Sequence, residues 1–424
     1  MAEDDIYGSK AKYELFKDNY EYWLSPKVRI EGKRGKERKY ICLNPRNFVY
    51  FKKLMTNFEA RDISYIRRVR VFQSMKLICN TLKKDLEKCT REDINELLAR
   101  LHETYKTPIS KTSFIKDVKF IWKNIFPEKD EKGRPDETMI PYVVRHLKAV
   151  LDKSKQRLRS DKLTLAEFEE IVNYFGHDKR MQAYLTLALE SLGRPQEILY
   201  RRIGNVELYD NYAKIYITEH GKEGPGLLQC IDSYPYLLKW LQEHPFKGDK
   251  NAFLFVNTGN TNRGKPLKPT NINKMIKSAC KELGIEKPIT CYSLKRSGVT
   301  IRRLRGDSDM EIQHAARWTS SKQLKTYDLS NQNEAFDKEL EKRGLLKVVE
   351  LKETRPKICG FCNRLAGFGD LVCAGCMRPL DRKKILEEQE RKDREIIENK
   401  EQIKQEVTNE ILKRLSENKV IQLL

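Results

Sequence analysis

GDSDMEIQHAARWTSSKQLKTYDLS (residues 306–330) contains Trp318 and, nine residues later, Tyr327. The segment is polar and rich in serine and threonine. Taken alone, a tyrosine in such a segment predicts a half-buried anchor whose hydroxyl contacts water. The remainder of the chain gives this tyrosine a second interpretation.

Three further pieces precede this stretch in a fixed order. None is specific by itself, since Arg194 alone predicts a surface arginine at a helix start and Lys222 alone a solvated lysine in a turn. The pieces are Gly193-Arg194-Pro195-Gln196-Glu197, then Lys222 in the turn GKEGPG between two strand-like runs, then Tyr292-Ser293-Leu294-Lys295-Arg296-Ser297.

The ordered set, with the spacing from Trp318 to Tyr327, resembles the catalytic domain of the tyrosine recombinases, the phage-integrase and Xer/Cre-like family. The resemblance covers roughly residues 165–345. It implies that Tyr327 is a nucleophile forming a 3′-phosphotyrosyl intermediate. It also implies that Arg194 is the first catalytic arginine and that Glu197, one helical turn further on, orients the site.

The same resemblance implies roles for two more side chains. Lys222 matches the lysine that protonates the leaving 5′ oxygen, with Lys214 in the preceding strand as an alternative. Trp318 takes the position of a histidine or tryptophan, where an indole N–H can donate to a phosphate oxygen. His314 is interpreted as a helix-surface or packing residue.

The segment YSLKRS departs from the family's pattern. Tyr292 stands at the histidine position and Lys295 at the second arginine position. A phenol is a poor general base near neutral pH, and a lysine keeps the charge but loses the bidentate fork. Arg296 lies about 100° further round a helix and is the second choice for the arginine role.

Chemistry gives this set a physical rationale. Strand cleavage by a tyrosine needs an oxygen nucleophile, cations near the non-bridging phosphate oxygens and a proton donor for the departing oxygen. An arginine supplies a planar fork that matches two phosphate oxygens. The phosphodiester's energy is kept in the phosphotyrosyl bond, so catalysis is expected to need no cofactor, neither ATP nor a metal.

Composition agrees with a polyanionic partner. The chain has 83 lysines and arginines against 61 acidic residues, a formal net charge of +22. Such an excess favours double-stranded DNA, and by resemblance the working form is a homotetramer on two DNA sites. No run of eighteen apolar residues occurs, so no membrane contact is expected. The acidic, polar start of the chain is not typical of a secretory signal, and the expected location is cytoplasmic, associated with the nucleoid.

The predicted fold class is mainly α with a small antiparallel sheet (α+β). A basic linker is expected over 153–162. The expected parts are a basic N-terminal extension (1–60), a helical core-binding domain that clamps DNA (61–150), a catalytic domain (163–345), a zinc-ribbon-like segment (355–380) and a long amphipathic helix (381–424). For KVRIEGKRGKERK (27–39), a solvated loop and an arm on the DNA backbone are both open.

Four of the ten cysteines fall in two CxxC pairs, at Cys359, Cys362, Cys373 and Cys376. This spacing predicts a closed, tetrahedral, structural Zn²⁺ site. A segment this poor in large apolar residues would need the metal to fold.

The function predicted is a site-specific DNA recombinase, or integrase. The alternative is a catalytically degenerate DNA-binding protein that retains the fold, which the departures at Tyr292 and Lys295 would explain. A relaxing topoisomerase of similar chemistry is a third possibility.

Overall fold

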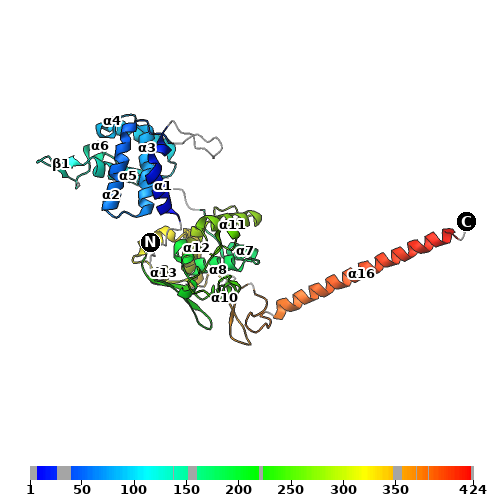
Figure 1. Cartoon of the computed structure of the whole chain (residues 1–424). Helices are drawn as coiled ribbons and strands as arrows, with labels where there is room; N and C mark the ends of the chain where they lie inside the picture. The colour runs from blue at the N-terminus through cyan, green and yellow to red at the C-terminus, as the bar shows by residue number, and fades with distance from the viewer. Residues whose placement is uncertain are drawn as a thin grey trace. The chain divides into compact units, whose positions relative to one another are not determined.

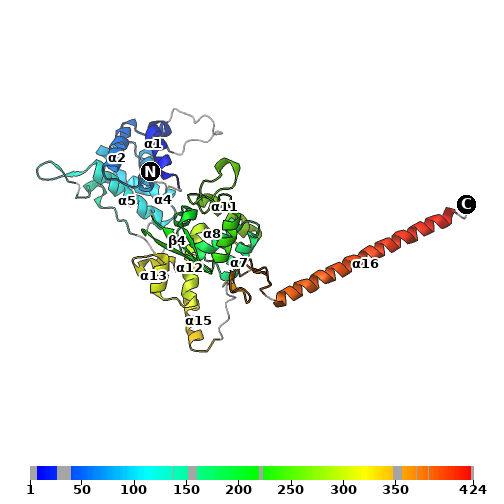
Figure 2. The same ribbon diagram turned by 60° about the horizontal axis from the view of Figure 1, so that its bottom comes forward.

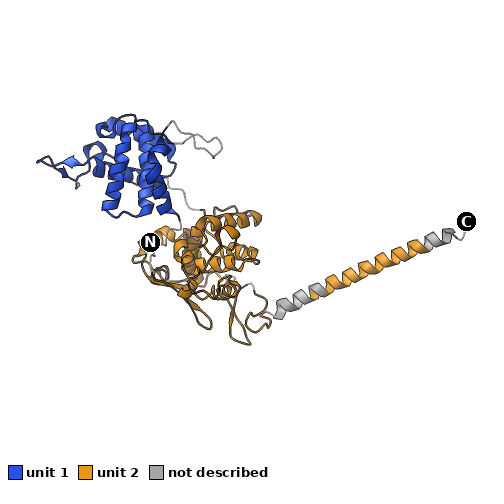
Figure 3. Ribbon diagram, in the orientation of Figure 1, with its two compact units in different colours: residues 1–158 blue, residues 159–424 orange. Residues whose placement is uncertain are grey.

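The chain divides into two compact units, residues 1–158 and 159–424 (Figure 3). The structure is a computed structural model. It describes residues 7–25, 40–136, 138–150, 160–218, 223–346, 356–368, 370–380 and 382–421, with side chains in the last range given at 390 and 393–414. The basic stretch 27–39 and most of the predicted linker lie outside these residues.

Unit 1 is helical, with one short hairpin (Figure 1). Aromatic rings fill its core: Tyr13 stacks on Phe72 with ring centroids 5.4 Å apart, and Phe16 lies 4.7 Å from the same ring. Its elements are α1 (Ser9–Leu24), η1 (Pro45–Asn47), α2 (Phe48–Ala60), α3 (Tyr65–Thr81), η2 (Leu86–Lys88), α4 (Arg91–Thr104), α5 (Pro108–Ile125), β1 (Glu128–Lys129), β2 (Pro135–Asp136) and α6 (Tyr142–Arg145).

The prediction of a separate extension over residues 1–60 was wrong for the part described. Helices α1 and α2 bury their apolar faces in the same core as α3 and α5. Tyr13, Phe51 and Phe58 are each 0% exposed. The basic stretch 27–39 separates α1 from α2 in the sequence and suggested an extension. The two flanking helices nevertheless carry enough aromatic surface to pack into the core of unit 1.

Local capping explains where several helices begin. Thr90 and Asp93 form a capping box at α4. Thr107 caps α5, and Pro108 occupies the first position of that helix. Helix α6 is a single turn.

Unit 2 surrounds a small sheet with helices. Thr164 and Glu167 form a capping box at its first helix. Its elements up to residue 346 are α7 (Leu165–Tyr174), α8 (Lys179–Glu190), α9 (Pro195–Leu199), η3 (Ile203–Asn205), β3 (Val206–Leu208), β4 (Ala213–Ile217), β5 (Gly226–Cys230), α10 (Tyr234–Glu243), η4 (Asn260–Asn262), α11 (Pro269–Glu282), α12 (Cys291–Arg305), α13 (Asp309–Ala316), η5 (Ser321–Gln323), α14 (Leu324–Tyr327) and α15 (Gln332–Lys342).

Strands β3, β4 and β5 form an antiparallel sheet in sequence order. The register pairs Ile215 with Leu228 and Ile217 with Gly226, so inward-facing positions of β4 and β5 alternate with outward ones. The apolar run AFLFVN (252–257) has the composition of a strand but forms isolated bridges, such as Val256 with Pro266. The predicted fold class is confirmed: mainly α with a small antiparallel sheet.

Helices α8 and α12 lie side by side in unit 2 in both views (Figure 1 and Figure 2). They approach closely at Gly298, where an added Cβ would lie 2.2 Å from the backbone oxygen of Leu189. Because α8 leads into the turn at Arg194 and α12 carries Lys295, this close packing sets the distance between two predicted site residues.

The chain ends in β6 (Lys357–Ile358), β7 (Leu365–Ala366) and α16 (Arg382–Ile421). Every side chain described in α16 is exposed. Among the described helices, none is long and apolar enough to cross a membrane.

Candidate active site

Arg194 stands in the turn between α8 and α9, and its position follows from local sequence. Pro195 occupies the first position of α9, and the backbone N–H of Arg194 donates to Glu197 Oε2 at 2.7 Å. Arg194 Nη1 also donates to Glu197 Oε1 at 3.3 Å. The Arg-x-x-Glu spacing therefore makes one helical turn in which the glutamate holds the arginine.

A second carboxylate holds the other end of the same guanidinium. Arg194 Nη2 donates to Glu223 Oε1 at 2.5 Å, and the two side chains are 6% and 8% exposed. Burial disfavours the charge of Arg194, but Glu197 and Glu223 outweigh it and raise the pKa of Arg194. The sequence did not point to Glu223, which directly follows Lys222.

Lys295 projects from α12 into the same site and is 0% exposed. Its Nζ lies 5.3 Å from the ring centroid of Trp318 and 5.5 Å from that of Tyr327. Burial, followed by the positive charges of Arg194 and Arg317, lowers the pKa of Lys295 to about 7. Within the described residues, its ammonium group has no hydrogen-bond partner.

Trp318 and Tyr327 lie together, with ring centroids 5.1 Å apart. Trp318 is 4% exposed and packs in a small apolar cluster with Leu192, Val299 and Leu324. Tyr327 is half-buried at the end of α14 against that cluster. Helix α14 and the preceding turn η5 thus place the tyrosine beside the tryptophan and the lysine.

Arg317 is a third cationic residue at this site, after Arg194 and Lys295, and the sequence did not point to it. It ends α13 in the left-handed conformation, with φ 57°. Its Nη2 donates to Glu197 Oε2 at 2.5 Å, and its side chain is 9% exposed. In the sequence, Arg317 is marked only by its place immediately before Trp318. That position shows neither an apolar periodicity nor a capping residue.

Other predicted residues lie elsewhere or outside the described ranges. Lys222 falls outside them. Arg296 forms a buried ion pair with Asp161, so it is engaged away from Arg194. Tyr292 is half-buried against the large core of unit 2.

The two alternative residues are also accounted for. Lys214, in β4, lies over the ring of Tyr209, 5.2 Å from its centroid. His314 is exposed on α13, in keeping with its interpretation as a surface residue.

The site gathers buried N–H donors that lack acceptors among the residues described. They belong to three side chains and are Lys295 Nζ, Arg317 Nε, Arg317 Nη1 and Trp318 Nε1. Buried donors are nearly always paired in folded proteins, so such a group needs an explanation. An anion with several oxygens would be a suitable acceptor for such donors, and Tyr327 lies beside two of the side chains, Lys295 and Trp318.

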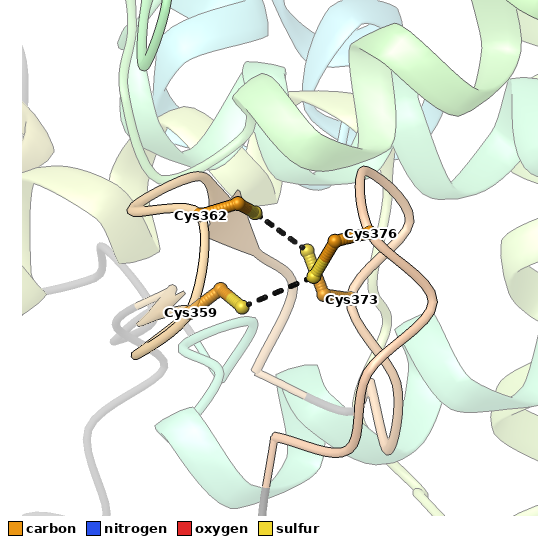
Figure 4. A group of neighbouring side chains, drawn as sticks. All are labelled: Cys359, Cys362, Cys373 and Cys376. Atoms are coloured by element: carbon orange, nitrogen blue, oxygen red, sulfur yellow. Dashed lines mark hydrogen bonds between the residues drawn. The ribbon is translucent and has the colours of Figure 1, made fainter.

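The four paired cysteines come together in the hairpin segment after residue 355 (Figure 4). Their sulfurs all lie within 4.8 Å of one another, with Cys359–Cys376 and Cys362–Cys373 each at 3.5 Å. Four thiolates about 2.3 Å from a tetrahedral Zn²⁺ would lie about 3.8 Å apart. The donor set therefore fits a closed zinc site, and the segment docks on α10 through Tyr236 and Phe368, with ring centroids 5.6 Å apart.

Comparison with known proteins agrees with the resemblance noted in the sequence. Residues 161–334 match the model described as the phage integrase family. No curated protein matches the chain.

Several solved structures share the fold. A lambda integrase dimer bound to a COC′ core site has a TM-score of 0.53 at 17% identity, covering 67% of this chain and 96% of that chain. XerH site-specific recombinase bound to palindromic difH substrate has a TM-score of 0.52 at 16% identity, covering 67% and 80%. The Tn1549 transposon integrase in complex with transposon right end DNA has a TM-score of 0.51 at 12% identity, covering 70% and 99%. Over residues 161–334, the chain matches the phage integrase family, the family of the tyrosine recombinases.

Proposed function

We propose that the protein is a site-specific DNA recombinase that cleaves and rejoins DNA through a 3′-phosphotyrosyl bond at Tyr327. One observation carries this proposal: Tyr327 lies against a buried group of cationic and neutral N–H donors that lack acceptors among the described residues. Such preorganised donors stabilise the charge that develops on a phosphate during transfer.

The proposed reaction is a transesterification. Tyr327 Oη forms a bond to the scissile phosphorus as the bond from phosphorus to the 5′ oxygen breaks. The phenolic proton leaves to water, and the 5′ oxygen takes a proton from the general acid, for which Lys222 is the candidate. Glu223, its neighbour in the sequence, contacts Arg194, which supports a place for this hairpin at the site.

Arg194 and Lys295 would neutralise the phosphate, and Trp318 would donate its indole N–H. Glu197 would fix the orientation of Arg194, while Arg296 would support α12 through Asp161. Tyr292, at the edge of the core, would contact a phosphate through its hydroxyl. A phosphate monoanion beside Lys295 favours the ammonium form, so DNA binding would raise the pKa of Lys295.

DNA would be held by both units, and the strongly basic balance predicts that binding falls steeply with salt. The helical unit would be the core-binding domain, and a homotetramer on two sites the working assembly. A lambda integrase tetramer bound to a Holliday junction, with a TM-score of 0.52 and 17% identity, supports this assembly by analogy of fold. The cytoplasm, at the nucleoid, is the proposed location.

Cys359, Cys362, Cys373 and Cys376 would hold a structural Zn²⁺. The ion would stabilise the hairpin segment and take no part in cleavage, since no described contact joins these cysteines to the site at Tyr327.

The test uses a library of DNA duplexes with a randomised central segment and a nick in one strand. After cleavage near the nick, the short 5′-hydroxyl fragment diffuses away and the covalent complex cannot religate. We expect denaturant-stable protein–DNA complexes enriched in one sequence. Sequence-selective binding without any covalent complex would favour the degenerate DNA-binding protein, and covalent complexes without sequence preference would favour a topoisomerase.

A further inference from the structure

The proposed site has fewer free guanidinium donors than its residue list suggests. Lys295 stands where the resemblance places an arginine. Arg194 already uses Nη1 on Glu197 and Nη2 on Glu223. These two carboxylates hold both ends of the Arg194 guanidinium, so a second guanidinium with unpaired donors would add to what Arg194 can offer a phosphate.

Arg317 has that capacity. Its Nη2 donates to Glu197, whereas Nε and Nη1 are buried and lack acceptors among the residues described. Burial and the charge of Arg194 are the larger causes that lower the pKa of Lys295, and the positive charge of Arg317 lowers it further. Arg317 therefore shares Glu197 with Arg194 and lies near enough to Lys295 for its charge to act there.

The backbone is built to place this side chain. Arg317 is the C-cap of α13 at φ 57°, a conformation that non-glycine residues adopt at some cost. Opposite it, Gly226 opens β5, and a Cβ there would lie 2.8 Å from Arg317 Cδ. Two local features thus turn Arg317 inward and leave room for its side chain.

We propose that Arg317 is a catalytic residue that contacts the scissile phosphate and supplies the second guanidinium that Lys295 lacks. The proposal deepens the proposed function and rests on it for the identity of the phosphodiester. Glu197 then orients two guanidinium groups at once, Arg194 through Oε1 and Arg317 through Oε2. The alternative role is purely structural, a brace that only holds Glu197.

The first experiment needs no DNA site. Inorganic phosphate is added to the full-length protein at constant ionic strength set with chloride, and the melting temperature and binding heat are measured. Wild type is expected to show a saturating stabilisation. Arg317→Ala should weaken phosphate binding at least about tenfold, as expected for the loss of a charged donor pair.

Matched variants separate binding from folding. Arg343→Ala removes the exposed arginine that caps the C-terminal end of α15 and pairs with Glu339, and this variant should bind phosphate as wild type does. Arg317→Lys keeps the charge and the pairing to Glu197 but loses the fork, so binding should be intermediate. Gly226→Ala displaces Arg317 without changing it and should weaken binding as well. If Arg317→Ala fails to fold, the last two variants decide.

The second experiment uses the DNA sequence recovered from the adduct library. Arg317→Ala should slow single-turnover cleavage by about 10²–10³-fold. With a methylphosphonate at the scissile position, which carries no charge on the non-bridging atoms, the deficit should shrink to within about tenfold, since there is no anion to neutralise. A brace for Glu197 would leave the deficit equal on both substrates.

The outcomes are distinct. Phosphate stabilisation equal in wild type and Arg317→Ala, or absent in wild type, would overturn the role of Arg317, as would equal deficits on the two DNA substrates. Failure of wild type to form any covalent complex would overturn the proposed recombinase function, while the phosphate titration still decides whether Arg317 binds the anion.

Discussion

Lys295 is a residue whose burial opposes folding. Its side chain is 0% exposed, its ammonium group lacks a hydrogen-bond partner among the described residues, and burial is the main cause that lowers its pKa to about 7. Replacing a buried ion pair by well-packed apolar side chains is often neutral or stabilises a protein by about 1–4 kcal/mol. Lys295 has the cost of burying a charge without a hydrogen-bond partner among the described residues. Such a residue is retained where it has a task other than stability.

We expect Lys295→Met to raise the free energy of unfolding and to impair cleavage. The pKa of Lys295 is about 7 in the folded protein and about 10.5 in the unfolded chain. The unfolded state therefore binds more protons between these values, so wild-type stability rises with pH across that window. The advantage of the methionine variant should be largest at pH 7 and below and shrink towards pH 10. Urea unfolding at several pH values measures it, and an advantage that grows with pH would contradict this account.

The sequence pattern names Arg194, Glu197, Lys295, Trp318 and Tyr327 as candidate site residues. The structure brings these five side chains together. Their order along the chain carried that information. Arg317 and Glu223 were missed because their side chains reach the site only through the fold. One follows a helix end in the left-handed conformation, and the other leaves a hairpin turn.

At the scale of elements, the packing of α8 on α12 fixes the site. Gly298→Ala would place a Cβ against the backbone oxygen of Leu189, at 2.2 Å before relaxation. We expect a loss of about 1–3 kcal/mol in unfolding free energy, from overpacking. Gly248→Ala, where the added Cβ meets nothing within 4 Å, should stay within about 0.5 kcal/mol of wild type in the same urea titration. Equal stabilities would show that α12 can shift away from α8.

The cysteine hairpin is an element with its own predicted stability. We expect about one Zn²⁺ per chain by elemental analysis, lost in Cys373→Ser and retained in Cys280→Ala, a buried cysteine of α11. Metal loss should open residues 356–380 to protease while the rest of unit 2 resists, since the apolar core of that unit lies mostly outside the hairpin. Full zinc content in the Cys373 variant would contradict the assigned ligand set.

Elements with strong local signals were predictable, and those set by tertiary contacts were not. Thr90 and Thr164 begin their helices through capping boxes that are visible in the sequence. The run AFLFVN has the composition of a strand, yet its backbone forms only bridges, one of them between Arg202 and Phe253. Pairing partners, not propensity, decided that segment.

At the scale of the whole molecule, α16 presents an apolar stripe with exposed Ile396, Ile403, Val407 and Ile411. Such a stripe is typical of helices that associate. We expect the double variant Ile403→Ala and Ile411→Ala to weaken oligomerisation on DNA. The double variant Gln405→Ala and Asn409→Ala, on the opposite face, is the control. Sedimentation of the protein–DNA complexes measures the difference, and identical distributions would rule out an assembly role for the stripe.

Composition and periodicity predict the domain organisation from a basic, aperiodic segment between two helical patterns, and most of that segment lies outside the described residues. The N-terminal boundary was misplaced because the aromatic faces of α1 and α2 flank a basic stretch. The composition of residues 1–60 does not reveal that α1 and α2 share one apolar core with α3.

Covalent attachment of DNA to Tyr327 Oη is the step on which the whole proposed reaction depends. The covalent complex formed on the selected DNA is digested with trypsin and nuclease, and the peptide Thr326–Lys338 is examined by mass spectrometry. We predict that this peptide carries a nucleotide joined through its 3′ phosphate to Tyr327. The adduct should be lost in Tyr327→Phe and kept in Tyr212→Phe, an exposed tyrosine of the same unit. A nucleotide found on another residue, or a covalent complex that persists in Tyr327→Phe, would contradict the account.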